Sequence, residues 1–220
     1  MTQARRFDLI VFDWDGTLFD STALITKSIQ GACRDVGTAV PSDAAASYVI
    51  GLGLREALAH AAPTLDPALY GELAKRYRHH YVTRQHELSL FQGTLDMLKA
   101  LKGRQHGLAV ATGKARRGLN DALAHADLVH MFDATRTADE TASKPDPLML
   151  RELMAELGTR PERTLMVGDT THDLEMARRA GTPSVAVSYG AHEPKAFGDY
   201  APLTVSHTTT ELTQWFLQHA

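Results

Sequence analysis

Residues 7–17 read FDLIVFDWDGT, and this stretch decides the fold. Its apolar run predicts a strand over Phe7–Asp13 that is buried on both faces of a sheet. Two carboxylates, Asp13 and Asp15, stand at the end of that run, and Gly16 allows the chain to bend after them. Asp and Gly also form ordinary turns after strands, so the stretch by itself leaves that alternative open.

Further apolar runs predict more strands, with helical patterns between them. The predicted strands are Gly107–Thr112, Thr164–Gly168 and Pro183–Val187, with a shorter one at Met131–Asp133. Apolar residues recur at helical spacing within Thr171–Ala180 and Asp146–Leu157, which predicts two helices. Strands that alternate with helices predict an α/β fold, in which a Rossmann-like parallel sheet carries helices on both faces.

One long segment interrupts this alternation. From about Asp20 to Gln92 the pattern is helical and contains no convincing strand. Roughly seventy residues are too many for a simple crossover between neighbouring strands of a compact sheet. We therefore expect a core domain of residues 1–19 and 93–220, with residues 20–92 inserted as a small α-helical cap domain.

The composition excludes several classes of protein. Of 220 residues 44% are hydrophobic, which is ordinary for a globular protein, and a net charge of −3 offers no positive surplus for nucleic acid. No apolar stretch approaches the about 18 residues of a membrane span, and Met1–Arg6 is not followed by a signal-peptide pattern, so we expect a cytoplasmic protein. The only cysteine, Cys33, excludes an intramolecular disulfide and a cysteine zinc cage. The oligomeric state stays open.

Two polar segments follow predicted elements in the middle of the chain. Thr112 and Gly113 stand at the end of a predicted strand, where a hydroxyl and backbone N–H groups can hold phosphate oxygens. An ordinary helix cap has the same pattern. Lys144 precedes Pro145 in a stiff segment, which predicts a fixed positive charge unless this lysine is a solvated surface residue.

A second pair of carboxylates follows the strand predicted at Thr164–Gly168. Asp169 and Asp173 straddle the end of this strand and the start of a helix, and such hard oxygen ligands suit magnesium. Open parallel sheets bind ligands at the carboxyl ends of their strands. We therefore expect these two acids to lie near Asp13 and Asp15 in one site.

The combination resembles the haloacid dehalogenase superfamily, in particular its phosphoglycolate phosphatases, from Phe7 to about Gly190. The matching residues are the DWDGT segment at 13–17 for the first motif, Thr112 for the second, Lys144 for the third, and Asp169 with Asp173 for the fourth. Two positions depart from the family. Gln92 stands where relatives often have proline, and Gly113 where they often have asparagine.

The resemblance implies a magnesium-dependent phosphatase acting on a small phosphorylated metabolite such as phosphoglycolate. Asp13 would be the nucleophile that forms an aspartyl-phosphate, and Asp15 the general acid and base. The implied Mg²⁺ ligands are Asp13, the backbone carbonyl of Asp15, Asp169, and Asp173 directly or through water. The implied phosphoryl-binding residues are Thr112, Gly113 and Lys144.

Two other basic residues receive different interpretations. Arg55 follows the turn at residues 51–53 of the predicted cap, where it would bind an anionic leaving group; the alternative is an ordinary helix-surface arginine. Lys114 is interpreted as an exposed residue at a helix start, so we expect substitution of Lys144 to cost more activity. A phosphomutase of the same superfamily is the main alternative function, and a non-catalytic binding protein is a further one.

Overall fold

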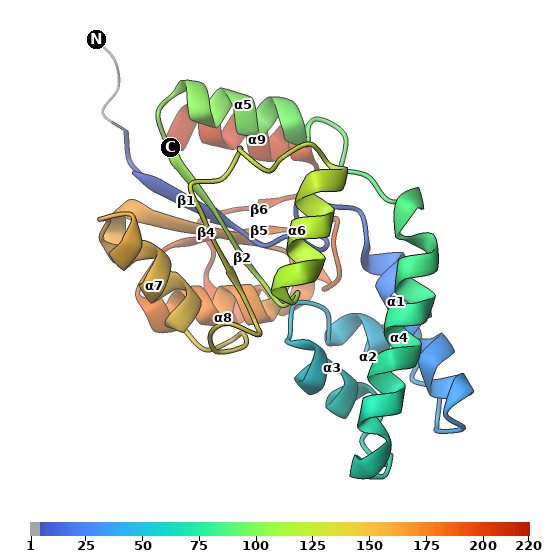
Figure 1. Ribbon diagram of the computed structural model, residues 1–220. Helices are drawn as coiled ribbons and strands as arrows, with labels where there is room; N and C mark the ends of the chain where they lie inside the picture. Colours follow the sequence, from blue (N-terminus) through green and yellow to red (C-terminus); the bar gives the residue numbers. More distant parts are fainter. Residues whose placement is uncertain (1–4) are drawn as a thin grey trace.

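The computed structural model describes residues 5–220, and its centre is a sheet of parallel strands in the order β3-β2-β1-β4-β5-β6 (Figure 1). The strands are β1 (Leu9–Phe12), β2 (Gly107–Thr112), β3 (Ala134–Thr137), β4 (Thr164–Gly168), β5 (Ser184–Val187) and β6 (Val205–Ser206). The predicted α/β class is therefore confirmed. Met1–Ala4, which belong to the segment considered for a signal peptide, lie outside the described residues.

Two strands differ from the expectation drawn from the sequence. The strand predicted at Met131–Asp133 is wrong, because β3 begins only at Ala134. Asp133 is used differently: its N–H donates to the Leu108 carbonyl (2.7 Å) and its Oδ2 accepts from the Leu108 N–H (2.8 Å). The observed strand reads ATRT, without the apolar run that marks the buried strands. β6 has two residues, too few to show any periodicity.

Helices cover both faces of the sheet. One face carries α5 (Thr94–Gly103), α6 (Arg116–His125) and α9 (Thr209–His219), and the other carries α7 (Leu148–Glu156) and α8 (Thr171–Ala180). Ile10 and Phe12 of β1 enter the apolar cluster of the first face, while Leu9 and Val11 enter that of the second. This is why the whole sequence of β1 is apolar. Within residues 5–220 no helix has the length and apolarity needed to cross a membrane.

The segment between β1 and α5 is helical, as predicted. It contains α1 (Thr22–Asp35), α2 (Asp43–Tyr48), α3 (Leu54–Ala61) and α4 (Tyr70–Arg84), and we call residues 20–92 the cap segment. Its helices share an apolar cluster of their own, in which Leu73 and Cys33 are fully buried. In Figure 1 these helices lie together beside the sheet rather than over one of its faces.

The two stretches of chain that join the cap segment to the sheet run side by side. The N–H of Asp20 donates to the Ser89 carbonyl (3.0 Å), and the N–H of Phe91 donates to the Leu18 carbonyl (3.1 Å). The separate apolar cluster and this paired crossing support a division at residues 19/20 and 92/93. We propose on these grounds that the cap segment is a domain of its own.

Leu73→Ala tests this division, because Leu73 is fully buried inside the cap segment. The change should cost about 2–5 kcal/mol of stability where the side chain packs. If the cap segment is a separate cooperative unit, amide hydrogen exchange should speed up in α1–α4 while β1 and β4 keep their protection.

The matched control is Leu153→Ala in α7, where the leucine is equally buried against the sheet. This variant should exchange faster in the strands. Equal loss of protection in both regions of the Leu73→Ala protein would show that the chain unfolds as one unit.

Candidate active site

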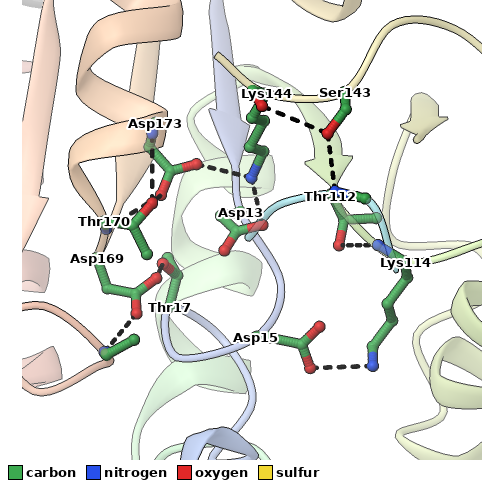
Figure 2. Close-up of polar contacts among 12 residues, drawn as sticks. Asp13, Asp15, Thr17, Thr112, Lys114, Ser143, Lys144, Asp169, Thr170 and Asp173 are labelled. Carbon is green, nitrogen blue, oxygen red and sulfur yellow. Dashed lines mark hydrogen bonds and ion pairs between the residues drawn. The ribbon is translucent and has the colours of Figure 1, made fainter. Parts of the chain in front are cut away.

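Polar residues from three neighbouring strands meet at one edge of the sheet. Asp13 follows β1, Thr112 ends β2 and Asp169 follows β4 (Figure 2). β1 pairs with β2 on one side and with β4 on the other. The chain leaves β1 toward β2 and later returns to its opposite side at β4. This reversal is the topological switch point at which open α/β sheets bind ligands.

Lys144 is buried in this site and bridges two of its acids. Its Nζ donates to Asp13 Oδ1 (2.6 Å) and to Asp173 Oδ1 (2.7 Å), as Figure 2 shows. Burial alone would lower the pKa of Lys144, but the charges of Asp13 and Asp173 raise it above its ordinary value. The side chain therefore keeps its positive charge, and the alternative of a solvated surface lysine does not apply.

Three buried acids form a cluster around this lysine. Asp13, Asp169 and Asp173 each place a carboxylate oxygen within 4.8 Å of the others. Burial, reinforced by the charges of its acidic neighbours, raises the pKa of Asp13 well above its ordinary value, although Lys144 opposes the shift. Burial and the charge of Asp173 raise the pKa of Asp169 to about 7. Carboxylates crowded in this way are stabilised by a shared cation, and oxygen donors of this kind suit Mg²⁺.

The two oxygens of Asp13 have different surroundings. Oδ1 accepts the hydrogen bond from Lys144, whereas Oδ2 is buried and has no hydrogen-bond partner among residues 5–220. A buried oxygen without a partner costs free energy, so such atoms are rare unless a ligand or a reaction uses them. Asp13 thus presents one restrained and one available oxygen.

Neighbouring residues orient the other two acids. Asp169 accepts from Thr17 Oγ1 (2.8 Å) and from the Ala191 N–H (2.7 Å). Asp173 Oδ2 accepts from the hydroxyl (2.7 Å) and the N–H (3.1 Å) of Thr170, which caps the N-terminus of α8. Gly16, with a φ of +85°, leaves room here, because a Cβ at this position would collide with the Asp169 carboxylate. The sequence signal for Thr17 and Thr170 was their place inside the two acidic motifs.

Asp15 lies on the side of the site that faces the cap segment. Ser21 Oγ donates to Asp15 Oδ1 (2.6 Å), and Lys114 Nζ lies 3.0 Å from the same oxygen. Lys114 Nζ also donates to the hydroxyl of Tyr81 in α4 (3.1 Å). The second carboxylate of the DWDGT segment is thus held by a cation that itself contacts the cap segment.

The interpretation of Lys114 as an exposed helix-start residue is wrong. Its side chain is only 11% exposed, because α6 begins at Arg116 and Lys114 lies in the preceding loop, beneath Tyr81 of α4. The difference expected between substitutions of Lys144 and Lys114 depended on that exposure and no longer follows. The sequence could have indicated that Lys114 lies near the site, because it stands two residues after Thr112. It could not have indicated that Tyr81 of α4 covers this lysine.

Thr112 is the last residue of β2, and Gly113 is the first residue of the loop between β2 and α6. Thr112 is fully buried, and its Oγ1 accepts from the Lys114 N–H (3.2 Å). A Cβ at Gly113 would collide with the backbone carbonyls of Gly51 and Leu52 in the cap segment. Glycine, where the family often has asparagine, therefore lets the cap backbone lie directly on the core.

Other contacts also join the cap segment to the core. The Gly53 N–H donates to Ser143 Oγ (2.7 Å), next to Lys144. The carbonyl of Tyr48 accepts from the Nε2 atoms of His172 (2.8 Å) and His192 (3.0 Å). Both histidines thus connect the core to the end of α2 in the cap segment.

Arg55 lies in the first turn of α3 and is exposed. Within the described chain it has no hydrogen bond or ion pair from its side chain. Its position two residues after Gly53 places it near the boundary between the cap segment and the core. A role for Arg55 in substrate binding stays a prediction.

The chain matches known proteins over most of its length. The family model described as haloacid dehalogenase-like hydrolase matches residues 10–187. A probable phosphatase, IndB, from Dickeya dadantii is 34% identical over 210 residues, which cover 93% of this chain and 91% of that protein. A phosphoglycolate phosphatase from Aliivibrio fischeri is 31% identical over 207 residues, covering 90% and 91%. A solved hydrolase from Pseudomonas syringae has a similar fold, with a TM-score of 0.86 at 20% identity over 96% of this chain and 99% of its own.

The chain therefore belongs to the haloacid dehalogenase-like hydrolase family. Its relatives identify it as an enzyme of the phosphatase type, similar to phosphoglycolate phosphatases. The resemblance noted in the sequence is confirmed.

Gly113→Ala tests the close approach of the cap segment. The added methyl group would meet the carbonyls of Gly51 and Leu52, which are backbone and cannot rotate away, so residues 51–53 must move off the core. We expect the Gly53 amide to exchange with solvent at least about tenfold faster, because its hydrogen bond to Ser143 is lost. Hydrogen exchange followed by mass spectrometry measures this rate.

Gly118→Ala is the matched control, because a Cβ there meets open space on α6. It should leave the Gly53 amide unchanged and stabilise the helix by about 0.5–1 kcal/mol. An unchanged Gly53 amide in the Gly113→Ala protein would contradict the close packing.

Proposed function

We propose that this enzyme is a magnesium-dependent phosphatase that hydrolyses small phosphate monoesters through an aspartyl-phosphate on Asp13. One observation carries the proposal. Asp13 is a fully buried carboxylate with Oδ1 held by Lys144 and Oδ2 without a partner in the described chain. A nucleophile needs an oxygen that is both oriented and unengaged, and Asp13 Oδ2 meets both conditions.

The reaction has two steps. In the first, Asp13 Oδ2 attacks phosphorus, the bond between phosphorus and the ester oxygen breaks, and Asp15 donates a proton to the leaving alkoxide. In the second, Asp15 takes a proton from water, the water oxygen attacks phosphorus, and the acyl-phosphate bond breaks to release inorganic phosphate. One carboxyl group serves both steps, because the proton that it loses to the leaving group in the first step is replaced by a proton from water in the second. Ser21 and Lys114 support this role by holding Asp15 in place.

Mg²⁺ fits the acidic side of the site. Asp13 and Asp169, with the backbone carbonyl of Asp15, would supply hard oxygen donors, and the crowded negative charges of the acid cluster favour a cation. Asp173 would act indirectly, since its oxygens already accept from Lys144 and Thr170. A bound Mg²⁺ would offset negative charge on the transferring phosphoryl group.

Lys144 and the loop after β2 complete the phosphoryl site. The Lys144 ammonium balances the charge of Asp13, so a dianionic phosphate can approach the nucleophile. Thr112 and Gly113, at the end of the neighbouring strand, would hold phosphoryl oxygens through the hydroxyl and backbone N–H groups. The similarity to a phosphoglycolate phosphatase supports a small phosphorylated metabolite as the substrate.

Asp13→Asn should abolish turnover while leaving the fold intact. The amide has the same shape but cannot form the acyl-phosphate, so kcat should fall by about four orders of magnitude or more. Phosphate release from p-nitrophenyl phosphate in the presence of Mg²⁺ measures the loss, and circular dichroism checks the fold.

Asp121→Asn is the control, since this acid is exposed on α6. Turnover near the wild-type rate in a folded Asp13→Asn protein would exclude Asp13 as the nucleophile. Interconversion of sugar phosphates by the wild-type enzyme without net phosphate release would indicate a mutase instead.

Mg²⁺ should raise the melting temperature more at about pH 8 than at about pH 6. The pKa of Asp169 is raised to about 7 from 3.8, so between these values the folded protein holds a proton that the unfolded chain has lost. Stability without metal therefore falls as the pH rises through this window. A cation binds the ionised carboxylate, so its stabilising effect grows as the proton leaves. Thermal unfolding with and without excess Mg²⁺ at the two pH values measures the difference.

Asp169→Asn should remove most of the Mg²⁺ effect at both pH values. A monovalent salt of equal ionic strength controls for general screening. A Mg²⁺ effect that is equal at both pH values, or that survives Asp169→Asn, would contradict the assignment of Asp169 as a ligand.

A further inference from the structure

The site contains one buried lysine, Lys144, and one largely buried lysine, Lys114, and the two contact different acids. Lys144 is engaged by Asp13 and Asp173, on the side of the acid cluster. Lys114 is engaged by Asp15, on the side of the cap segment. In the proposed reaction Asp15 contacts the ester oxygen of the leaving group. Lys114 therefore lies where the rest of the leaving group has to be placed, and Figure 2 shows it on the far side of Asp15 from the acid cluster.

The ammonium group of Lys114 has donor capacity left over. A lysine has three N–H donors. Lys114 Nζ forms an ion pair with Asp15 Oδ1 (3.0 Å) and donates a hydrogen bond to the Tyr81 hydroxyl (3.1 Å). No third acceptor contacts its Nζ within residues 5–220. Burial would lower the pKa of Lys114, but the charge of Asp15 and the neighbouring tyrosines raise it above the ordinary value, so the group stays charged.

The surroundings of Lys114 favour a small leaving group. Its Nζ lies 4.8 Å from the centre of the Tyr81 ring, which stacks on Tyr77 with ring centres 6.1 Å apart. The cap backbone at residues 51 and 52 lies directly on Gly113, the residue before Lys114. Because aromatic rings and close-packed backbone surround the ammonium group, we expect the leaving group beside it to be short. The N–H of Lys114 that has no acceptor favours an anionic group at the end of that leaving group.

We propose that Lys114 selects phosphate esters of short 2-hydroxy acids, by binding the carboxylate that lies one carbon from the ester oxygen. The inference rests on the proposed phosphatase function and adds Lys114 as the residue that recognises the leaving group. Asp15 contacts the ester oxygen, and Lys114 bridges Asp15 and the carboxylate, so the two groups recognise adjacent parts of one small molecule. A neutral leaving group leaves the Lys114 donor unpaired in a buried place, which costs binding.

The test compares kcat/KM for phosphoglycolate, ethyl phosphate and phosphoethanolamine, whose leaving groups are anionic, neutral and cationic. The wild-type enzyme should prefer phosphoglycolate to ethyl phosphate by at least about thirtyfold, and phosphoethanolamine should be the poorest substrate. Lys114→Met should reduce the preference for phosphoglycolate over ethyl phosphate at least about tenfold. The ratio is the readout, because loss of the contact to Asp15 is expected to lower activity on every substrate.

Two further variants serve as controls. Lys99→Met removes an exposed lysine of α5 and should leave the ratio unchanged. Arg55→Ala removes the other candidate for binding an anionic leaving group. Collapse of the ratio in Arg55→Ala with an unchanged ratio in Lys114→Met would overturn the proposal. If Lys114→Met does not fold, Lys114→Gln takes its place. The preference of the wild-type enzyme for phosphoglycolate over ethyl phosphate tests the proposal without any variant.

Failure of the inference is distinguishable from failure of the proposed function. Release of phosphate from phosphoglycolate and ethyl phosphate at equal kcat/KM by the wild-type enzyme would overturn the role of Lys114 and leave a phosphatase. No release from any of the three esters in the presence of Mg²⁺ would overturn the proposed function, and the inference with it. A ratio that favours phosphoglycolate and collapses with Lys114 would support both.

Discussion

The bridge from Lys144 to Asp13 and Asp173 is the interaction on which the rest of the site depends. It joins the end of β1 to the start of α8 through an ammonium group with no exposure to solvent. Buried charges cost several kcal/mol each when unpaired, so neither acid could stay ionised in this place without the lysine. Because the bridge uses only Oδ1 of Asp13, it orients the carboxylate and leaves Oδ2 available. Capping of α8 by Thr170 then holds Asp173 against the same lysine.

A second constraint is the contact between the cap segment and the core. Gly113 has to be glycine for the carbonyls of Gly51 and Leu52 to lie on the loop after β2. Lys114, the next residue, contacts Asp15 on the core and Tyr81 on the cap segment. In the proposed reaction the phosphoryl group would lie on the side of the site built by the sheet, and the leaving group on the side built jointly by the sheet and the cap segment. With this arrangement the residues that act on phosphorus can stay the same while the residues that contact the leaving group differ.

Much of the sheet could be predicted because its central strands are buried on both faces. β1, β2, β4 and β5 each contain a continuous apolar run for that reason, and the helix at Thr171–Ala180 was predicted with its observed bounds. The edge strands were harder. β3 reads ATRT because Thr135 and Arg136 are half-exposed, and β6 is too short for a pattern. Solvent at an edge removes the apolar signal on which strand prediction relies.

By itself the sequence determined the class of chemistry, since Asp13, Asp15, Lys144, Asp169 and Asp173 each stand beside a predicted strand or proline-stiffened turn. A parallel sheet brings its carboxyl ends to one edge, so local pattern was enough to bring these side chains together. Only the tertiary structure decided the place of Lys114. Its partners come from α4 and from the turn after β1, far away in the sequence, and no local periodicity encodes how a helical insertion packs back on the core. The residues that would contact the leaving group therefore lie where sequence reasoning is weakest, in the contact between the cap segment and the sheet.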